Sequence, residues 1–423
     1  MVHHHRSIRH SKLLELLGIS ENNKDAIHVK QPSYWNALYV LLVLGLSVAP
    51  SLTITLIPMR NYFESEPHLY ELALDQLRNT LVIVPLLVIT VILDCYFCFN
   101  LTSVVCIQSF LRLLVPVTLT NVFLHCLLSQ IWNVGLGYNL PVPFIALLWF
   151  PISGLLLLSI WFEFPYKLRK NKIYRRRFIF YITGFELISC IIFQYDALSI
   201  MIPMLPTDFQ WSLAFVLPLL RASNLWMVDK CMSQTVQCNS KSAKFGLITF
   251  IRSLNTIYVA IILANITETT LYSISGMEFL LQFHLCYKII TLHRQTKPDG
   301  IDNGERKEKI KECVVELVVG ETIEVLASVA YSITLAAAYY GPNATILGNI
   351  RNSYWTYDEI KDIHKSLILI LKITALDLGM AIFCGGILWI FCRINLFQEF
   401  CAMIKTNWFV ISLRISVIMS RVG

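Results

Sequence analysis

The chain has 423 residues, of which 56% are hydrophobic and only 15% are charged, and its mean hydropathy is +0.59. Soluble domains carry roughly 25% charged residues, and a single soluble core stops growing near ~250–300 residues. These values exclude an ordinary soluble protein and indicate that the excess apolar surface lies in a bilayer. In such a protein the distribution of the net charge of +7 matters more than its sum.

Residues 1–33 are predicted to form a cytosolic N-terminal tail. They open with His3, His4 and His5 and lack the uncharged apolar stretch and small-residue cleavage site of a signal peptide. The leucines between 13 and 19 would share one helical face. The tail is therefore either a short helix on the membrane surface or an unstructured segment.

Ten apolar stretches have, or nearly have, the roughly 20 residues that a helix needs to cross a bilayer. Helices are expected because barrel strands would be shorter and would alternate in polarity. The sequence therefore predicts an all-α, polytopic transmembrane helix bundle over 34–393, with about ten spans and eleven possible. The stretches are approximately 36–57, 80–99, 102–128, 143–163, 178–194, 209–226, 245–265, 271–291, 316–340 and 366–392.

The distribution of Lys and Arg predicts the orientation of these spans. Segment 167–177 carries seven cations, whereas 129–142 and 195–208 carry none. When ten spans are threaded, every cation-rich loop falls on the side of the N-terminus. Because such loops stay in the cytosol, we expect the N-terminus, the basic loop 166–177 and the linker 292–313 to be cytosolic. The loops 58–79 and 341–365 are then outer loops, in a plasma membrane or an endomembrane.

The first outer loop contains a helical pattern. Ser65 is a suitable N-cap with Pro67 just inside the helix. Leu69, Leu72 and Leu77 follow at helical spacing. We expect a short amphipathic helix that lies on the outer surface.

The C-terminal segment 394–423 is predicted to be an amphipathic tail. Its apolar part, 407–419, is short and is interrupted by Arg414. It could be an interfacial helix or part of an eleventh span.

The 12 cysteines are too few for a disulfide scaffold of this length. Cys95 and Cys98 form a CxxC at the end of an apolar run, where helix packing explains them better than metal or redox chemistry. The predicted outer loops contain no cysteine, so we expect no structural disulfide.

Three glutamates begin the ninth apolar stretch: Glu316, Glu321 and Glu324. If Tyr340 marks the outer interface, Glu321 and Glu324 lie roughly 2 and 6 Å inside the inner boundary, at 1.5 Å per residue. We expect them to face the cytosolic interface or a cation on a neighbouring helix. The alternative is an anionic vestibule that attracts cations.

Other ionisable side chains lie deeper, with Arg252 and Lys372 at intermediate depth. Each costs at least ~2.5–3.5 kcal/mol if left alone in the membrane, so Arg112 and Asp377 are expected to face the bundle interior. Two interpretations stay open: internal salt bridges that hold helices together, or a polar pathway for a solute or a proton. The deeper residues are Arg112, Glu186, Glu278 and Asp377.

Enzyme motifs are lacking. The sequence contains no GxSxG, HExxH or P-loop pattern, and its later histidines are isolated. Glu64 and Glu66 resemble an acidic catalytic loop but are explained by helix capping. We expect no catalytic residue, no metal site and no cofactor.

The segment YYGPNATILGNIRNSYW, residues 339–355, carries the turn dipeptides Gly341-Pro342 and Gly348-Asn349. It resembles a loop in a set of multi-pass membrane proteins of protists, especially oomycetes. There too GPN, LGN and YW follow a long helix, and a span with an aspartate comes next, as Asp377 does here. The resemblance supports the membrane class and implies no activity.

The sequence therefore favours a transporter or channel for an unidentified small solute or ion. The alternative is a membrane receptor or scaffold whose buried charges are purely structural. The bilayer is an expected partner, and nucleic acid is not. A pathway predicts a continuous polar cavity, whereas a scaffold predicts solid packing with every charge paired.

Overall fold

The computed structural model describes residues 33–56, 69–99, 107–136, 149–202, 205–235, 241–263, 268–295, 303–342 and 363–422. Throughout these ranges the chain is almost entirely helical and contains no strand. The predicted all-α class is confirmed. The helices are α2 (Ser33–Leu56), α3 (Leu69–Phe99), α4 (Ile107–Leu136), α6 (Trp149–Glu163), α7 (Tyr166–Lys170), α8 (Lys172–Met201), η4 (Thr207–Ser212), α9 (Leu213–Thr235), α10 (Lys241–Leu263), α11 (Glu268–Arg294), α12 (Asn303–Tyr340), α14 (Ile363–Cys392) and α15 (Leu396–Val422).

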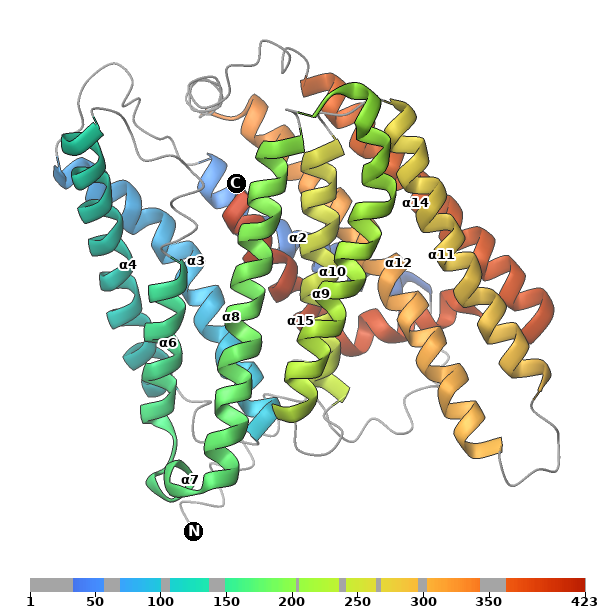
Figure 1. The fold of residues 1–423 in the computed structure, drawn as a ribbon, viewed down its shortest axis with the longest axis horizontal. Coiled ribbons are helices and arrows are strands. Elements are labelled where there is room, and N and C mark those ends of the chain that lie inside the picture. The colour runs from blue at the N-terminus through green and yellow to red at the C-terminus, as the bar shows by residue number, and fades with distance from the viewer. Residues whose placement is uncertain are drawn as a thin grey trace.

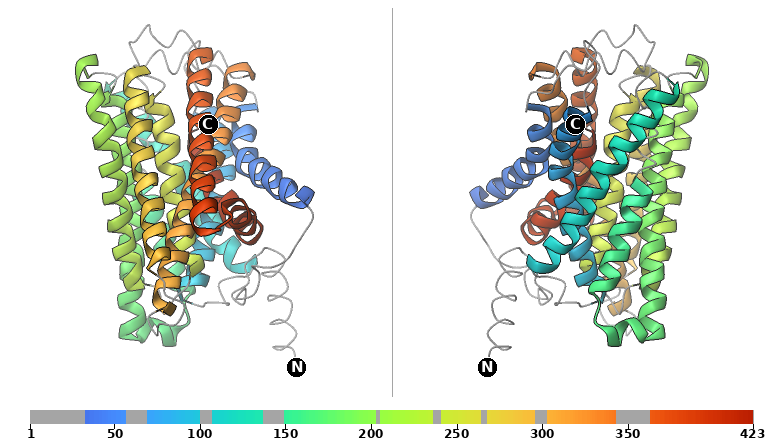
Figure 2. Two further views of the ribbon diagram at one scale, coloured as in Figure 1. Left: turned by 90° about the vertical axis from the view of Figure 1, so that its right-hand side faces the viewer. Right: turned by 90° about the vertical axis from the view of Figure 1, so that its left-hand side faces the viewer.

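The long helices form one bundle, with α4 and α6 at one edge and α11 and α14 at the other (Figure 1). The short α7 lies at one end of the bundle, as do the end of α11 and the start of α12. Helix α2 and part of α15 lie on one face, outside the row of long upright helices (Figure 2). Helix α7 with the start of α8, and the end of α11 with the start of α12, thus share one end of the bundle, and these helix ends are rich in Lys and Arg.

Five of the described helical stretches are long and apolar enough to cross a membrane, and several shorter apolar helices accompany them. The composition is therefore that of a membrane-embedded protein. Helices α10, α11 and α12 do not meet the same criterion, and each carries charged residues in its central part. The five stretches are Gln108–Leu128, Lys172–Tyr195, Asp208–Cys231, Leu367–Cys392 and Leu396–Met419.

Two helices extend into predicted loops. Helix α3 begins at Leu69, so the second half of the loop 58–79 is its first turns rather than a separate surface helix. Helix α12 begins at Asn303, within the predicted linker 292–313. In α3, the helical spacing of Leu69, Leu72 and Leu77 continues into the apolar run with no helix-breaking residue between them.

The segment 394–423 does not form a peripheral tail. It forms α15, which packs against α2, α3, α10 and α12. Its stretch Leu396–Met419 is long and apolar enough to cross a membrane, in agreement with the alternative of an eleventh span. Residues 410–419 are all buried. Apolar residues on every side of a helix require partners on every side, and the bundle supplies them.

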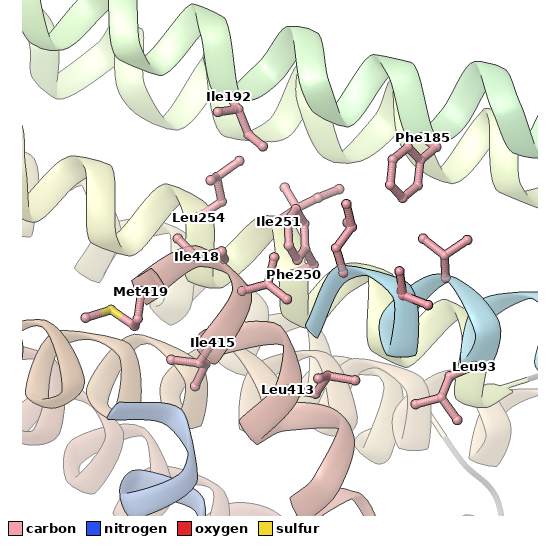
Figure 3. Close-up of a cluster of buried hydrophobic side chains, with 14 of the residues drawn as sticks. Leu93, Phe185, Ile192, Phe250, Ile251, Leu254, Leu413, Ile415, Ile418 and Met419 are labelled. Atoms are coloured by element: carbon pink, nitrogen blue, oxygen red, sulfur yellow. The ribbon is translucent and has the colours of Figure 1, made fainter. Parts of the chain in front are cut away.

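Figure 3 shows how this core is built. Leu413, Ile415, Ile418 and Met419 of α15 lie among side chains of α3, α8 and α10, all within one buried apolar cluster. These partners include Leu93, Phe185, Ile192, Phe250, Ile251 and Leu254.

Cys95 and Cys98 are both buried in this cluster, as expected for helix packing, and every cysteine that the structure describes is a free thiol. The predicted tail 1–32 and the distinctive part of the loop 339–355, from 343 on, lie outside the described residues.

Candidate functional site

Charged side chains meet where α9, α10, α11, α12 and α14 come together (Figure 1). Each of the five helices contributes at least one, from its central part: Arg221, Arg252, Glu278, Glu324 and Asp377. Helix α12 packs against α10, α11 and α14, and α9 packs against α10 and α11. We call these residues, together with Glu321 of α12, the charged cluster.

Arg221 joins three helices of the cluster. Its Nη2 donates a hydrogen bond to Oε1 of Glu324 on α12, and its Nη1 lies 3.8 Å from Oε1 of Glu278 on α11. The three side chains are largely buried. Charge-assisted bonds of this kind are strong when water is excluded, so Arg221 holds α9 against both acids.

Arg252 of α10 approaches α12 from another side. Its Nη1 lies 3.6 Å from Oε1 of Glu324, and its Nη2 lies 3.9 Å from Oε1 of the exposed Glu316. Glu316, Gly320 and Glu324 follow one another at four-residue spacing and so share one helix face. A Cβ atom at Gly320 would overlap Nη1 of Arg252. The glycine therefore provides the space in which the guanidinium lies.

Two carboxyl groups of the cluster have an oxygen without a hydrogen-bond partner in the part of the chain that the structure describes. Asp377 is 3% exposed and its Oδ1 is unpartnered; Glu321 is 7% exposed and its Oε2 is unpartnered. The hydroxyl of Ser328 is also buried and unpartnered. Buried polar atoms are normally bonded to protein or ordered water, so these atoms indicate a place for a ligand or water.

A small cavity lies inside the cluster. Its volume is about 20 Å³, and roughly 10–15 Å³ of such space is enough for one water molecule. It is too small for a sugar or an amino acid in this conformation. Most of the residues that line it are polar or charged, although their apolar atoms also contribute to the wall: Arg221, Asn255, Thr256, Val259, Glu278, Glu324, Ser328, Ile373 and Asp377.

A neutral hydrogen-bond network connects the cavity to α8. The hydroxyl of Tyr195 donates to Oδ1 of Asn255 at 2.7 Å, and the ring of Tyr195 stacks on Tyr258 with centroids 5.4 Å apart. Nδ2 of Asn224 donates to Oε1 of Gln194 at 3.5 Å. Polar side chains thus continue past the cavity, between α8, α9 and α10.

The structure brings together four of the six residues that the sequence singled out. Glu278, Glu321, Glu324 and Asp377 all belong to the charged cluster. Glu324 faces cations on neighbouring helices, Arg221 and Arg252, which is one of the two expected surroundings.

Arg112 does not join the cluster, and the prediction that it faces the interior is wrong. Its side chain is 59% exposed, and its Nη1 lies 3.6 Å from Oε1 of Glu163. Helix α4 begins only at Ile107, and Glu163 is the last residue of α6. The pair therefore lies near helix ends, where an exposed arginine costs little.

Glu186 is also separate. It is half-buried on α8, and its Oε1 accepts a hydrogen bond from Ser153 of α6 at 2.8 Å. No cation among the described residues pairs with it in the structure, and nothing connects it to the cavity.

Sequence reasoning did not single out Arg221, which is central to the cluster. A signal was available, since Arg221 lies within the apolar stretch 209–226. It also missed the pairing of Arg414 with Asp94, whose carboxylate accepts a hydrogen bond from Nη2 of Arg414.

Among the described residues, no group of three His, Cys, Asp or Glu side chains is arranged to hold a metal ion. No family model, curated protein or solved structure matches the chain.

Proposed function

We propose that the chain is a multi-pass membrane transporter of about ten spans that carries a small solute or ion, with the charged cluster as its polar site. One observation carries this proposal: a buried carboxyl oxygen, Oδ1 of Asp377, lines a polar cavity and has no partner among the described residues. Ionisable groups at such depth are expensive and usually mark a substrate or ion pathway.

The charged cluster contains more acidic groups than a purely structural role requires. A scaffold would be served by one cation for each anion, because a broken buried pair costs several kcal/mol. Here Glu324 has two arginines near it, whereas neither Asp377 nor Glu321 forms an ion pair with a described residue. This uneven distribution favours a site that binds something.

The size of the cavity favours a transporter over a channel. An open channel needs a continuous aqueous path, whereas this cavity accommodates about one water molecule. Such a cavity fits the closed state of a transporter, which opens to one side at a time around a central site.

Accessibility to a small water-soluble thiol reagent tests this proposal without knowledge of the solute. Ser328→Cys places a thiol on the cavity wall. In sealed vesicles, the expected result is modification of residue 328, read as a mass shift of its own peptide. Ser47→Cys, buried in α2, is the control that should stay unmodified, and Ser233→Cys, exposed on α9, should be modified fully. If residue 328 behaves like residue 47 from both sides of the membrane, the site is closed packing and the transporter proposal fails.

The alternative is a receptor or scaffold with structural charges. It is favoured by the ion pairs of Arg221 and Arg252, which tie α9, α10, α11 and α12 together. This alternative predicts the negative outcome of the labelling experiment.

The proposed topology places the N-terminus in the cytosol. Support comes from the basic helix α7 and start of α8 and from the basic start of α12, which lie at the same end of the bundle (Figure 1), as the positive-inside rule requires. An epitope tag within 167–177 should be detected only after selective permeabilisation of the plasma membrane. A tag within 341–365 should stay on the opposite side of the membrane. Detection of both tags on one side would contradict the span count between them.

A further inference from the structure

The charged cluster contains more acids than bases. Four carboxyl groups, those of Glu278, Glu321, Glu324 and Asp377, face two guanidinium groups, those of Arg221 and Arg252. An uncompensated buried carboxylate is so costly that the group neutralises instead. The cluster therefore needs additional positive charge, either as protons or as a bound cation.

Protons fit the site better than a metal ion. No three acidic, histidine or cysteine side chains among the described residues converge as metal ligands would. The guanidinium of Arg221 lines the same cavity and would repel a metal cation there. A protonated carboxyl is neutral, and its O–H can be donated to the hydroxyl of Ser328, which lines the same cavity and has no partner among the described residues.

The ion pairs indicate which carboxyl faces the cavity in its protonated form. Glu324 is held by both arginines and Glu278 lies 3.8 Å from Arg221, so both have a cation close by. Asp377 lines the cavity but has no cation paired with it in the structure, and its Oδ1 is unpartnered. Glu321 also has a free oxygen but does not line the cavity.

We propose that Asp377 is a proton-binding residue of this cavity and that it takes up and releases one proton as the cavity opens to water. In the step, one O–H bond forms at Oδ1 with a proton delivered by water, and it breaks again on release. The proposal deepens the proposed function, because it names the ion to which transport is coupled.

The charged groups around Asp377 determine how its ionisation would affect the contacts between helices. Arg221 faces it from α9, Glu278 from α11 and Glu324 from α12, and Arg252 lies 3.6 Å from Glu324. Glu321 of α12 is a further acid that interacts electrostatically with Asp377. On α14 itself, the side chain of Lys372 is exposed. The buried thiols of Cys286 and Cys384, between α11 and α14, are further titratable groups, on the side of Glu321.

Release of the proton adds a negative charge next to Arg221. Arg221 has two ion pairs, and the longer one is the 3.8 Å contact with Glu278. An ionised Asp377 would therefore compete most directly with Glu278 for the guanidinium. Movement of the guanidinium toward Asp377 would loosen α9 from α11. Proton release and opening of the helices are thereby linked.

Infrared difference spectroscopy of the full chain in lipid vesicles tests the proton site directly. A protonated carboxyl has a carbonyl stretch separate from carboxylate bands and shifts in D₂O. We expect such a band in the wild type at neutral pH, a decrease on raising the pH, and a weaker band in Asp377→Asn, since a second acid of the cluster keeps its proton. Glu312→Gln, an exposed acid on α12, is the matched control and should keep the full band. Asp377→Glu should restore the lost intensity, which shows that an Asp377→Asn effect is not a folding failure.

Two outcomes would overturn the proposal. Either the band keeps its full intensity in Asp377→Asn, whether or not it weakens in Glu321→Gln, or added Na⁺ removes it at constant pH, which would identify a metal cation as the ligand. The labelling of Ser328→Cys is independent of these readouts. If residue 328 is labelled but no carboxyl band depends on Asp377, the proton site alone is refuted. If the band depends on Asp377 but residue 328 is not labelled, transport alone is refuted.

Discussion

Two regions of the molecule bury an arginine among apolar helices, and they do so differently. In the first, Arg414 of α15 donates to Asp94 of α3, and its guanidinium lies 5.9 Å from the ring centroid of Phe250. In the second, Arg221 and Arg252 share the acids of the charged cluster beside a polar cavity. The first region has one acid for one base, and the second has twice as many acids as bases.

The comparison shows that charge balance, rather than burial, distinguishes the two regions. Arg414 is packed within the apolar cluster of α3, α10 and α15, and its partner satisfies it. A closed pair of this kind fixes the position of a helix. The charged cluster instead leaves a carboxyl oxygen of Asp377 unpartnered at a space for about one water molecule and a second one unpartnered at Glu321. This arrangement does little to stabilise a bundle but suits the binding of an ion.

The largest effect is expected for Arg414→Met. Removing one partner of a buried pair costs about 3–5 kcal/mol, because the remaining charge is left uncompensated. The folded fraction, measured by size-exclusion chromatography and thermal unfolding in detergent, should fall strongly. Adding Asp94→Leu should recover much of it, since an apolar replacement of the whole pair is often neutral. A stable single variant would show that the pair is not structural.

An aspartate-to-asparagine substitution should have different effects on stability in the two regions. Asp94→Asn leaves Arg414 without a counter-ion and should lower the folded yield. Asp377→Asn removes no ion pair seen in the structure, so its cost should be about 1 kcal/mol or less, while transport is altered. Folded yield and labelling of residue 328 should be measured side by side. Equal loss of yield at both positions would remove the distinction between the regions.

A moderate effect is expected for Gly320→Ala. The added methyl group displaces the guanidinium of Arg252 from Glu324, and the loss of a charge-assisted contact costs about 1–3 kcal/mol. Gly276→Ala on α11 is the matched control, because no atom lies within 4 Å of its added Cβ. Since alanine favours a helix over glycine, the control should be neutral or stabilising. The same thermal shift in both variants would contradict the packing of Arg252 on α12.

The smallest effect is expected for Arg112→Ala. Its pair with Glu163 is exposed, and such pairs contribute about 0–1 kcal/mol. Thermal unfolding should change little, and transport should be unaffected. A large loss in either measurement would mean that this end of α4 is buried in the working protein.

Much of the fold follows from local sequence. Apolar stretches of about 20 residues without strand-like alternation fix helices, because the backbone in lipid must satisfy its own hydrogen bonds. Four of the six predicted site residues met in one cluster for a related reason. A charged side chain in the middle of an apolar helix avoids the cost of desolvation by facing other charged groups, as Glu278, Glu324 and Asp377 do.

Tertiary packing decided the rest. The apolar stretch around Arg221 marks it as unusual, but only the packing of α9, α11 and α12 places it between Glu278 and Glu324. Arg414 interrupts an apolar run, which left an interfacial helix and an eleventh span both open, and its pairing with Asp94, 320 positions away, holds α15 in the core. Sequence determines that a buried charge needs a partner, because the cost of desolvation is local to the group. Which partner it finds depends on distances between helices that are far apart along the chain.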